Sequence, residues 1–234
     1  MEEKKCLIVS AGGTGTRMGT VIPKQFLVLD GIPILRRTIE AFLRAIPDIQ
    51  VITVLPEGHM DYWRAYCRKE NFLCPQRLVK GGFTRFHSVK NALAYVPEGA
   101  IVAVHDGVRP LITPGKIREL FQAAEKAPAV IPVLPVTDTL KLLERREGKL
   151  VSEGVQLDRS RVYGAQTPQV FQADSLKAAY GQQFDTLFTD DASVAERYGI
   201  PLTFIEGERF NLKITTPEDL VLARAIIDSS LRSE

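Results

Sequence analysis

The chain has 234 residues, of which 45% are hydrophobic and 25% charged, an ordinary composition for a globular protein. A formal net charge of +2, without any block of Lys or Arg, argues against a nucleic-acid surface. No apolar run approaches the roughly 18 residues of a membrane span, and the three cysteines lack metal-ligand spacing. We therefore expect one cytoplasmic domain over residues 1–234 with reduced thiols, binding neither nucleic acid nor membranes.

A glycine-rich bend follows the first apolar segment. Residues 6–9 predict a buried strand, and the glycines of 12–19 let backbone N–H groups turn toward an anion. Arg17 inside the bend and Lys24 just after it could bind phosphate oxygens. The spacing matches neither Gly-x-Gly-x-x-Gly nor the P-loop. The alternative is a tight strand-to-helix turn with two solvated cations.

Helical and strand patterns then alternate along the chain. Strands are expected over 51–55, 77–79, 101–105, 129–136 and 202–205, and helices over 31–46, 61–69, 86–95, 174–180, 190–198 and after Thr113 and Thr216. This alternation predicts an α/β fold with a mostly parallel sheet covered on both faces. Polar clusters at 12–24, 81–88 and 105–109 each follow a predicted strand. We expect them along one sheet edge, where such folds bind ligands.

Residues 138–163 break the alternation. The segment predicts two irregular polar strands around Glu147 and Gly148, with too little apolar surface for a buried hairpin. An exposed strand pair needs a surface to pack against, and a partner subunit is the simplest one. We therefore expect a protruding arm that is used for dimerisation.

The polar residues at these strand ends form a cationic set around one acid. The candidates are Arg17, Lys24, Gly82, Ser88, Asp106, Arg109, Thr139, Arg159, Thr167 and Lys213. Phosphoryl and nucleotidyl transfer depend mainly on positioning and neutralising oxygens, so this set favours them. Hydrolysis is disfavoured, because Gly-x-Ser-x-Gly is absent and the three histidines follow no metal-ligand pattern.

Each central candidate also has a structural interpretation. Asp106 could brace the turn after its strand, and Arg109 could be a plain ion-pair partner. Lys213 could be a solvated lysine on a strand, because alternation would point it away from its apolar neighbours. Arg159 lies in a charged arm and taken alone would be surface.

A series of motifs carries a family resemblance. In order they are AGGTGTRMG, PKQF, GG followed by Ser88, VHDGVRP, PVTDTLK, QTPQVF, TDDASVAE and LKITTPEDL, between about residue 6 and residue 227. The series resembles the bacterial 2-C-methyl-D-erythritol 4-phosphate cytidylyltransferases, within a group that also contains ribitol 5-phosphate enzymes. Eight motifs in order are specific, although single ones are weak.

The resemblance implies a homodimer with a Rossmann-like sheet of the nucleotide-diphospho-sugar transferase type and a swapped arm. It implies transfer of CMP from CTP to a sugar phosphate with release of pyrophosphate. The implied catalytic residues are Arg17, Lys24, Arg159 and Lys213. The implied substrate-binding residues are Ala11, Gly12, Gly13, Gly81, Gly82, Ser88, Asp106, Arg109, Thr139 and Thr167.

Mg²⁺ is the expected cofactor, bridging triphosphate oxygens with Asp106 as its protein ligand. Phe210 and Phe83 stand where many relatives carry an acid, which removes a second carboxylate from the metal assignment. Two alternatives remain open from the sequence. One is a ribitol 5-phosphate cytidylyltransferase, and the other is a nucleotide-binding protein without catalytic activity.

Overall fold

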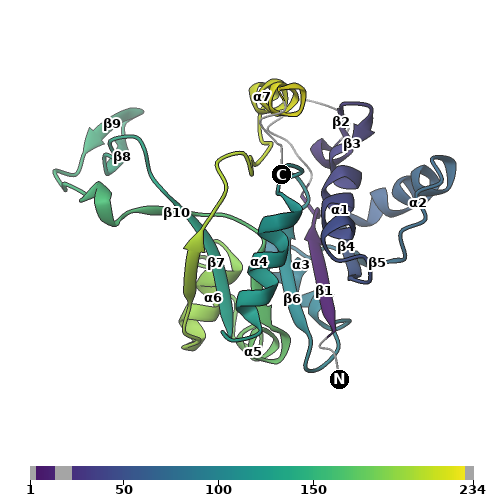
Figure 1. Ribbon diagram of the computed structural model, residues 1–234. Coiled ribbons are helices and arrows are strands. Elements are labelled where there is room, and N and C mark those ends of the chain that lie inside the picture. Colours follow the sequence, from purple (N-terminus) through teal and green to yellow (C-terminus); the bar gives the residue numbers. More distant parts are fainter. Residues whose placement is uncertain (1–3, 14–22, 230–234) are drawn as a thin grey trace.

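The computed structural model describes residues 4–13 and 23–229 (Figure 1). Its strands are β1 Lys5–Ser10, β2 Val28–Leu29, β3 Ile32–Pro33, β4 Gln50–Leu55, β5 Gln76–Lys80, β6 Ile101–Asp106, β7 Ala129–Pro135, β8 Leu143–Arg146, β9 Lys149–Ser152, β10 Tyr163–Ala165, β11 Gln169–Gln172 and β12 Thr203–Glu206. Its helices are η2 Lys24–Phe26, α1 Ile34–Ala45, η3 Glu57–His59, α2 Met60–Lys69, α3 Arg85–Leu93, α4 Pro114–Ala124, η4 Arg159–Arg161, α5 Ala173–Ala179, α6 Asp191–Tyr198 and α7 Pro217–Asp228.

An eight-stranded sheet forms the centre of the molecule. Its strand order is β10-β7-β11-β6-β1-β4-β5, with β12 also pairing with β7. The pairs of β1 with β4 and β6, of β4 with β5 and of β12 with β7 are parallel. β11 is antiparallel to both β6 and β7, and β10 is antiparallel to β7. The predicted mostly parallel α/β sheet is therefore confirmed, with two antiparallel strands that the alternation did not predict.

Side chains of β1 separate the two layers of the core. Leu7 and Val9 face the cluster that contains α1, α2 and α4, whereas Cys6 and Ile8 face the cluster that contains α3, α5 and α6. This is the period of two expected for a strand that is buried on both faces. Helices accordingly cover both faces of the sheet, as Figure 1 shows.

Polar caps set the starts of the helices that flank the site. Thr113 accepts a hydrogen bond from the N–H of Lys116 at the start of α4, and a proline follows it. Asp190 caps α6 in the same way, accepting from the N–H of Ser193 at 2.8 Å. Thr216 and Asp219 form a reciprocal capping box at α7. The predicted helix starts at Thr113 and Thr216 are therefore confirmed.

The first predicted helix begins later than its apolar pattern suggested. Gly31 has a positive φ of 81° and Asp30 one of 48°, so the chain turns sharply there. β2 and β3 form a short antiparallel pair around this turn, and α1 begins only at Ile34.

None of the described helices is long and apolar enough to cross a membrane.

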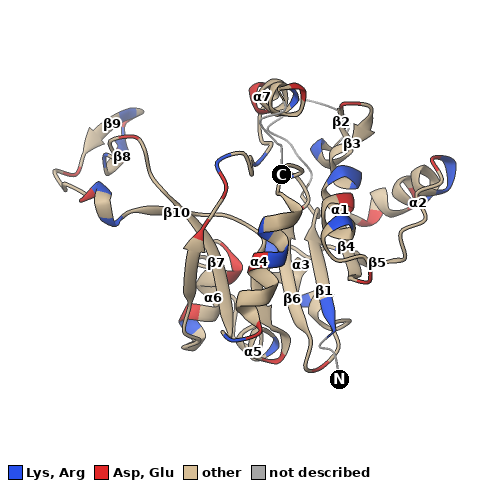
Figure 2. Cartoon of the chain, viewed as in Figure 1, with Lys and Arg blue, Asp and Glu red and all other residues tan. Residues whose placement is uncertain are grey.

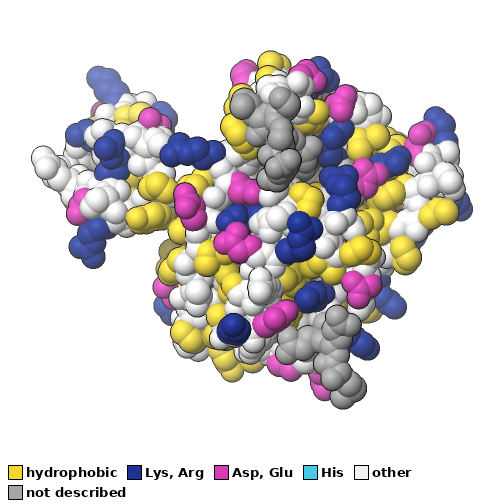
Figure 3. Space-filling view, in the orientation of Figure 1, with side chains coloured by type: hydrophobic (Ala, Val, Ile, Leu, Met, Phe, Trp, Pro, Cys, Tyr) yellow, Lys and Arg dark blue, Asp and Glu magenta, His cyan; other side chains and the backbone are white. Residues whose placement is uncertain are grey.

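Residues 138–163, called the arm below, extend away from the sheet and end in the antiparallel pair of β8 and β9 (Figure 1). Every residue of both strands is exposed. Glu147 and Gly148 have positive φ angles of 49° and 79°, which form the predicted turn. Figure 2 shows Lys, Arg, Asp and Glu spread over the arm, and Figure 3 shows hydrophobic side chains between them.

Candidate functional site

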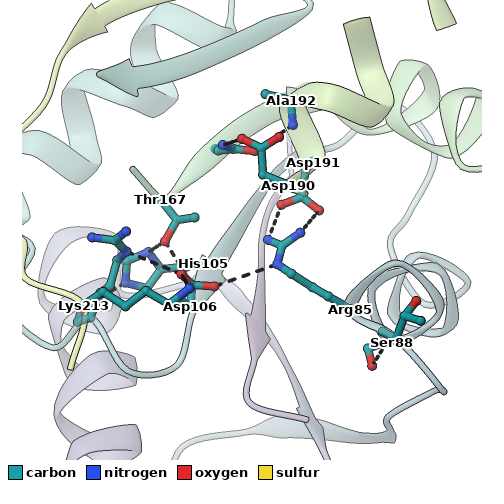
Figure 4. Close-up of polar contacts among 12 residues, drawn as sticks. Arg85, Ser88, His105, Asp106, Thr167, Asp190, Asp191, Ala192 and Lys213 are labelled. Carbon is teal, nitrogen blue, oxygen red and sulfur yellow. Dashed lines mark hydrogen bonds and ion pairs between the residues drawn. The ribbon is translucent and has the colours of Figure 1, made fainter. Parts of the chain in front are cut away.

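Asp106, the last residue of β6, lies at the centre of a group of three cations. Its Oδ2 is 2.9 Å from Lys213 Nζ and 3.5 Å from Arg109 Nε. Its Oδ1 is 3.9 Å from Arg85 Nε, on the opposite side (Figure 4). These four residues are called the Asp106 cluster below. Since the cations come from α3, from the turn after β6 and from the loop before α7, three separate segments meet at one carboxylate.

The cluster keeps Asp106 ionised although the residue is buried. Burial alone would raise the pKa of its carboxyl group, but attraction by Arg85, then Lys213, then Arg109 holds that pKa well below its usual value. Arg85 is affected in the opposite sense. Burial would lower its pKa, and the neighbouring Asp191 carboxylate raises it instead. The Asp106 carboxylate and the Arg85 guanidinium are therefore both charged at neutral pH.

His105 and Thr167 brace the backbone beneath Asp106. The N–H of Asp106 donates to Thr167 Oγ1 at 3.1 Å, and His105 Nδ1 lies 3.1 Å from the same oxygen. His105 Nε2 lies 3.0 Å from the carbonyl oxygen of Arg109. A carbonyl only accepts, so Nε2 carries the proton and Nδ1 accepts from the Thr167 hydroxyl. Burial lowers the pKa of His105 to about 4, which keeps it neutral.

Three hydrogen bonds of neighbouring residues bring Lys213 to the cluster. Arg109 donates to the carbonyl of Asn211 at 2.8 Å, and the Asn211 side chain donates to the carbonyl of Thr167 at 2.7 Å. The N–H of Ile214 donates to Val108 at 2.9 Å, and the Ile214 side chain is fully buried. The segment around Lys213 is thus an irregular loop fixed to the turn after β6. No strand forms at Lys213, so that part of the alternative is wrong, although its side chain is 43% exposed to solvent.

The glycine segments meet beside this cluster. The N–H of Gly82 donates to Ser88 Oγ at 3.0 Å, and Ser88 donates to the carbonyl of Thr84 at 2.9 Å. A Cβ on Gly12 would lie 3.3 Å from Ser88 Oγ and 3.7 Å from the Cα of Gly81. The close approach of Gly12, Gly81 and Ser88 therefore places the first loop against the segment after β5, as the sheet-edge rule predicted.

Gln25 fixes the described parts of the first loop. Its buried side chain donates to the carbonyl of Ala11 at 2.9 Å and to that of Gly13 at 3.3 Å. Lys24 is its neighbour in η2 and is thereby held next to the loop. Arg17 lies outside the described residues.

Arg85 connects the glycine segments to the Asp106 cluster. It is the first residue of α3, and its guanidinium forms a fork with Asp191 of α6, at 2.9 Å for Nη1 to Oδ1 and 2.5 Å for Nη2 to Oδ2. Tyr180 also donates to Asp191 Oδ1, at 2.6 Å. The Asp191 carboxylate is thus fully paired although it is inaccessible to solvent.

Thr139 and Arg159 stand apart from the other candidates. Both belong to the arm and are exposed, and Arg159 donates to the carbonyl of Thr137, next to the start of the arm, at 2.8 Å. Figure 1 shows the arm directed away from the sheet edge that carries the cluster. Among the described residues, one chain therefore gathers the predicted residues of its body but not those of its arm.

This arrangement has counterparts among known proteins. Residues 5–229 match the family model described as 2-C-methyl-D-erythritol 4-phosphate cytidylyltransferase. The chain belongs to the 2-C-methyl-D-erythritol 4-phosphate cytidylyltransferase family. The family resemblance of the motif series is therefore confirmed, as is the classification of the chain as a nucleotidyltransferase enzyme.

Named cytidylyltransferases of this family are similar over nearly their whole length. A relative from Bacteroides thetaiotaomicron is 46% identical over 224 residues, covering 96% of this chain and 100% of the relative. One from Azobacteroides pseudotrichonymphae is 47% identical over 227 residues, covering 97% and 100%. The crystal structure of the cytidylyltransferase from Thermus thermophilus aligns with a TM-score of 0.73 at 32% identity, covering 97% and 100%. Fold and sequence thus agree on the cytidylyltransferase family.

The structure also shows polar residues that the sequence did not single out. Arg85 lies between two predicted positions, Gly82 and Ser88, and Asp191 lies in the quoted motif TDDASVAE. Gln25 likewise follows Lys24 in PKQF. Their position inside the quoted motifs was the only signal in the sequence that could have identified them. It was not sufficient, because their contacts are to residues distant in sequence.

Proposed function

We propose that the protein transfers CMP from CTP to 2-C-methyl-D-erythritol 4-phosphate. An oxygen of the acceptor phosphate attacks the α-phosphorus of CTP and forms a new P–O bond. The bond between the α-phosphorus and its bridging oxygen breaks, and pyrophosphate leaves with the electron pair. The product is 4-diphosphocytidyl-2-C-methyl-D-erythritol, a precursor in isoprenoid biosynthesis.

The Asp106 cluster is the observation that carries this proposal. The reaction brings two phosphate anions together, so cations must be in place before the reacting groups meet. Lys213, Arg109 and Arg85 are held around one carboxylate within 4 Å, beside the glycine segments and Lys24. Such a transfer requires no nucleophilic side chain.

The roles of the individual residues follow from their positions. Ala11 to Gly13, Gly81, Gly82 and Ser88 would hold the base and ribose, because these segments lie against one another at the sheet edge beside the Asp106 cluster. Arg17 and Lys24 would neutralise the triphosphate. Lys213, with Arg109 and Thr167 nearby, would hold the acceptor phosphate.

Mg²⁺ fits this site in a limited way. Among the described residues no group of three or more His, Cys, Asp or Glu could hold a metal ion. Asp106 can offer Oδ1, which has Arg85 Nε at 3.9 Å, whereas its Oδ2 is the closer contact of Lys213 and Arg109. Glu208 near Phe210 instead binds Thr113. One carboxylate suits Mg²⁺, which commonly takes its remaining ligands from phosphates and water. When bound, it would neutralise triphosphate charge.

The arm would complete the site of a second subunit in a homodimer. Four leucines and two valines of the arm are 40–62% exposed, and an isolated two-stranded hairpin is marginal in water. A partner subunit that covers these side chains would receive Thr139 and Arg159 at its acceptor pocket. This arrangement explains why the body of one chain does not gather them.

The first test is pyrophosphate release by the purified protein with CTP and Mg²⁺. 2-C-Methyl-D-erythritol 4-phosphate and ribitol 5-phosphate are compared as acceptors at equal concentration. We expect turnover with the first to exceed that with the second by at least about tenfold in kcat/KM. Preference for ribitol 5-phosphate would reassign the acceptor, and no release with either would contradict catalysis.

Mixing two inactive variants tests the shared site. In a heterodimer of Arg159→Ala and Lys24→Ala, one of the two sites would combine a wild-type body with a wild-type arm. Equal mixing with full subunit exchange should therefore restore about a quarter of the wild-type sites. The control mixes Arg159→Ala with Arg159→Ala/Lys24→Ala, which cannot form such a site. No recovery after demonstrated exchange would contradict the swapped arm.

A further inference from the structure

Arg85 lies between two buried carboxylates that belong to different parts of the fold. Its Nη1 and Nη2 donate to Asp191, and its Nε faces Asp106 Oδ1 at 3.9 Å (Figure 4). The fork of the guanidinium is thus occupied by Asp191, and the remaining N–H edge is directed at Asp106. Lysine could not make both contacts, because its ammonium is a single point charge without a fork.

Asp191 is a rigid anchor for this guanidinium. Its side chain is fully buried, and it accepts from Tyr180 as well as from Arg85. The preceding residue, Asp190, caps α6 and accepts from Gln169 at 2.7 Å, and Gln169 in turn accepts from the N–H of Ala192 at 2.8 Å. The start of α6 is therefore fixed to β11. Asp191, which binds Arg85, consequently lies on a well-anchored part of the fold.

Asp106 needs such a partner because its other cations share one oxygen. Lys213 and Arg109 both contact Oδ2, and Arg85 is the cation that faces Oδ1. Rotation of an aspartate carboxylate about its last torsion is loosely restrained and roughly two-fold. A cation fixed on the Oδ1 side narrows this rotation and keeps Oδ2 directed at Lys213.

We propose that Arg85, held by Asp191, is a positioning residue that fixes the Asp106 carboxylate and thereby the ammonium of Lys213. The inference rests on the proposed cytidylyl transfer for the identity of the reaction. Arg85 also begins α3, whose Ser88 binds Gly82. One side chain thus joins the nucleotide-binding segments to the acceptor-side lysine.

A double-mutant cycle on kcat/KM separates positioning from general stabilisation. Arg85→Gln should lower kcat/KM by about tenfold, because a small misplacement of the reacting groups is costly. In an Asp106→Asn background the same change should cost less than about twofold, because the residue through which Arg85 acts has lost its charge. Equal losses in both backgrounds would overturn the proposal. Arg85→Lys should remain impaired because it lacks the fork.

Further variants guard against loss of folding. Arg85→Gln leaves Asp191 buried without its cation, so Arg85→Gln/Asp191→Asn is made as a charge-balanced version and should show the same tenfold loss. Tyr180→Phe is the matched control, since it removes a hydrogen bond to Asp191 but leaves both Arg85 contacts. We expect Tyr180→Phe to stay within about twofold of wild-type kcat/KM.

A crystal structure of the charge-balanced variant separates this inference from the proposed function. If the wild-type protein releases no pyrophosphate, the cytidylyl transfer is contradicted, and the crystal structure still decides the positioning role. We expect the Asp106 carboxylate to be turned and Lys213 Nζ to be displaced from the 2.9 Å contact. An unchanged Asp106 and Lys213 geometry would overturn the role of Arg85 whatever the activity.

Discussion

The Asp106 cluster and the arm use the same kinds of side chain in opposite surroundings. In the cluster, Arg85 meets a fully buried Asp191 at 2.5 Å. In the arm, Arg146 meets Glu144 at a similar 2.7 Å, but both side chains are at least half exposed. An exposed pair contributes about 0–1 kcal/mol, whereas breaking a buried one costs about 3–5 kcal/mol. Similar distances therefore describe a fixed charge in one region and an adjustable one in the other.

The body and the arm therefore contribute differently to the proposed site. The body supplies charges whose positions its own packing determines. The arm supplies residues whose positions depend on whatever surface covers them. Because the two regions can be mutated separately, the contrast can be tested directly.

A matched pair of leucines tests whether the arm packs on its own chain. Leu176 in α5 is fully buried, and Leu150 in β9 is 62% exposed. Leu176→Ala should lower the free energy of unfolding by about 4 kcal/mol, because it leaves a cavity in the core. Leu150→Ala should change it by less than about 0.5 kcal/mol in urea titrations at protein concentrations where sedimentation detects only the monomer. A loss of several kcal/mol at Leu150 would erase the contrast.

The pH dependence of stability tests the neutral His105 beneath Asp106. Burial lowers its pKa from 6.5 to about 4, so the unfolded chain binds more protons between these values. The folded state should be fully favoured above pH 6.5 and should lose about 3 kcal/mol as the pH falls to 4. The charged groups that face His105 are Asp106, whose own pKa lies below this window, and Arg109.

The reference for this measurement is His105→Gln, which cannot titrate. Urea titrations across the same pH range should give a flatter curve for this variant, even if it is less stable throughout. An identical slope in both proteins would assign the acid sensitivity to other groups.

Removal of the acceptor-side cation tests the chemical part of the contrast. Lys213→Ala should lower kcat/KM for pyrophosphate release by about a hundredfold, because a preorganised charge is lost from the transition state. The control is Lys69→Ala in α2, where the side chain is 83% exposed and pairs with its neighbour Glu70 at 3.8 Å. Comparable losses for both lysines would contradict a specific role of the cluster.

The cap of α6 should give the smallest effect. Asp190→Ala removes the hydrogen bonds to Ser193 and Gln169 and should lower the free energy of unfolding by about 1 kcal/mol. Asp61→Ala is the comparison, since its side chain is 96% exposed. If thermal and urea denaturation do not distinguish the two variants, the Asp190 cap does not anchor the start of α6, where Asp191 binds Arg85.

The sequence predicted the sheet and the meeting of its glycine segments because both follow from local patterns. A β-branched or apolar run gives a strand, and parallel strands end at a common edge. This reasoning brought Gly12, Gly81 and Asp106 together. It did not give the direction of β11, because alternation in burial is the same for parallel and antiparallel strands.

The contacts of Arg85 could not be predicted from the sequence alone. Its fork joins residues 106 positions apart, and no local pattern specifies that pairing. The backbone conformation around Lys213 was harder still to predict, since its segment NLKIT alternates between polar and apolar residues like a strand. In the structure, hydrogen bonds from Arg109 and Asn211 hold that segment as an irregular loop. Tertiary contacts therefore determined the conformation where local preference was ambiguous.

The arm leaves and rejoins the sheet at neighbouring points. Pro135 at the end of β7 pairs with Tyr163 at the start of β10, and the N–H of Val136 donates to the carbonyl of Val162 at 3.2 Å. The intervening residues are thus an insertion between two hydrogen-bonded strands, and their number is not constrained by the sheet. Exchanging this insertion between relatives, or replacing it with a tight turn, is therefore a modular change. The body would keep its architecture while its capacity to complement another subunit was redesigned.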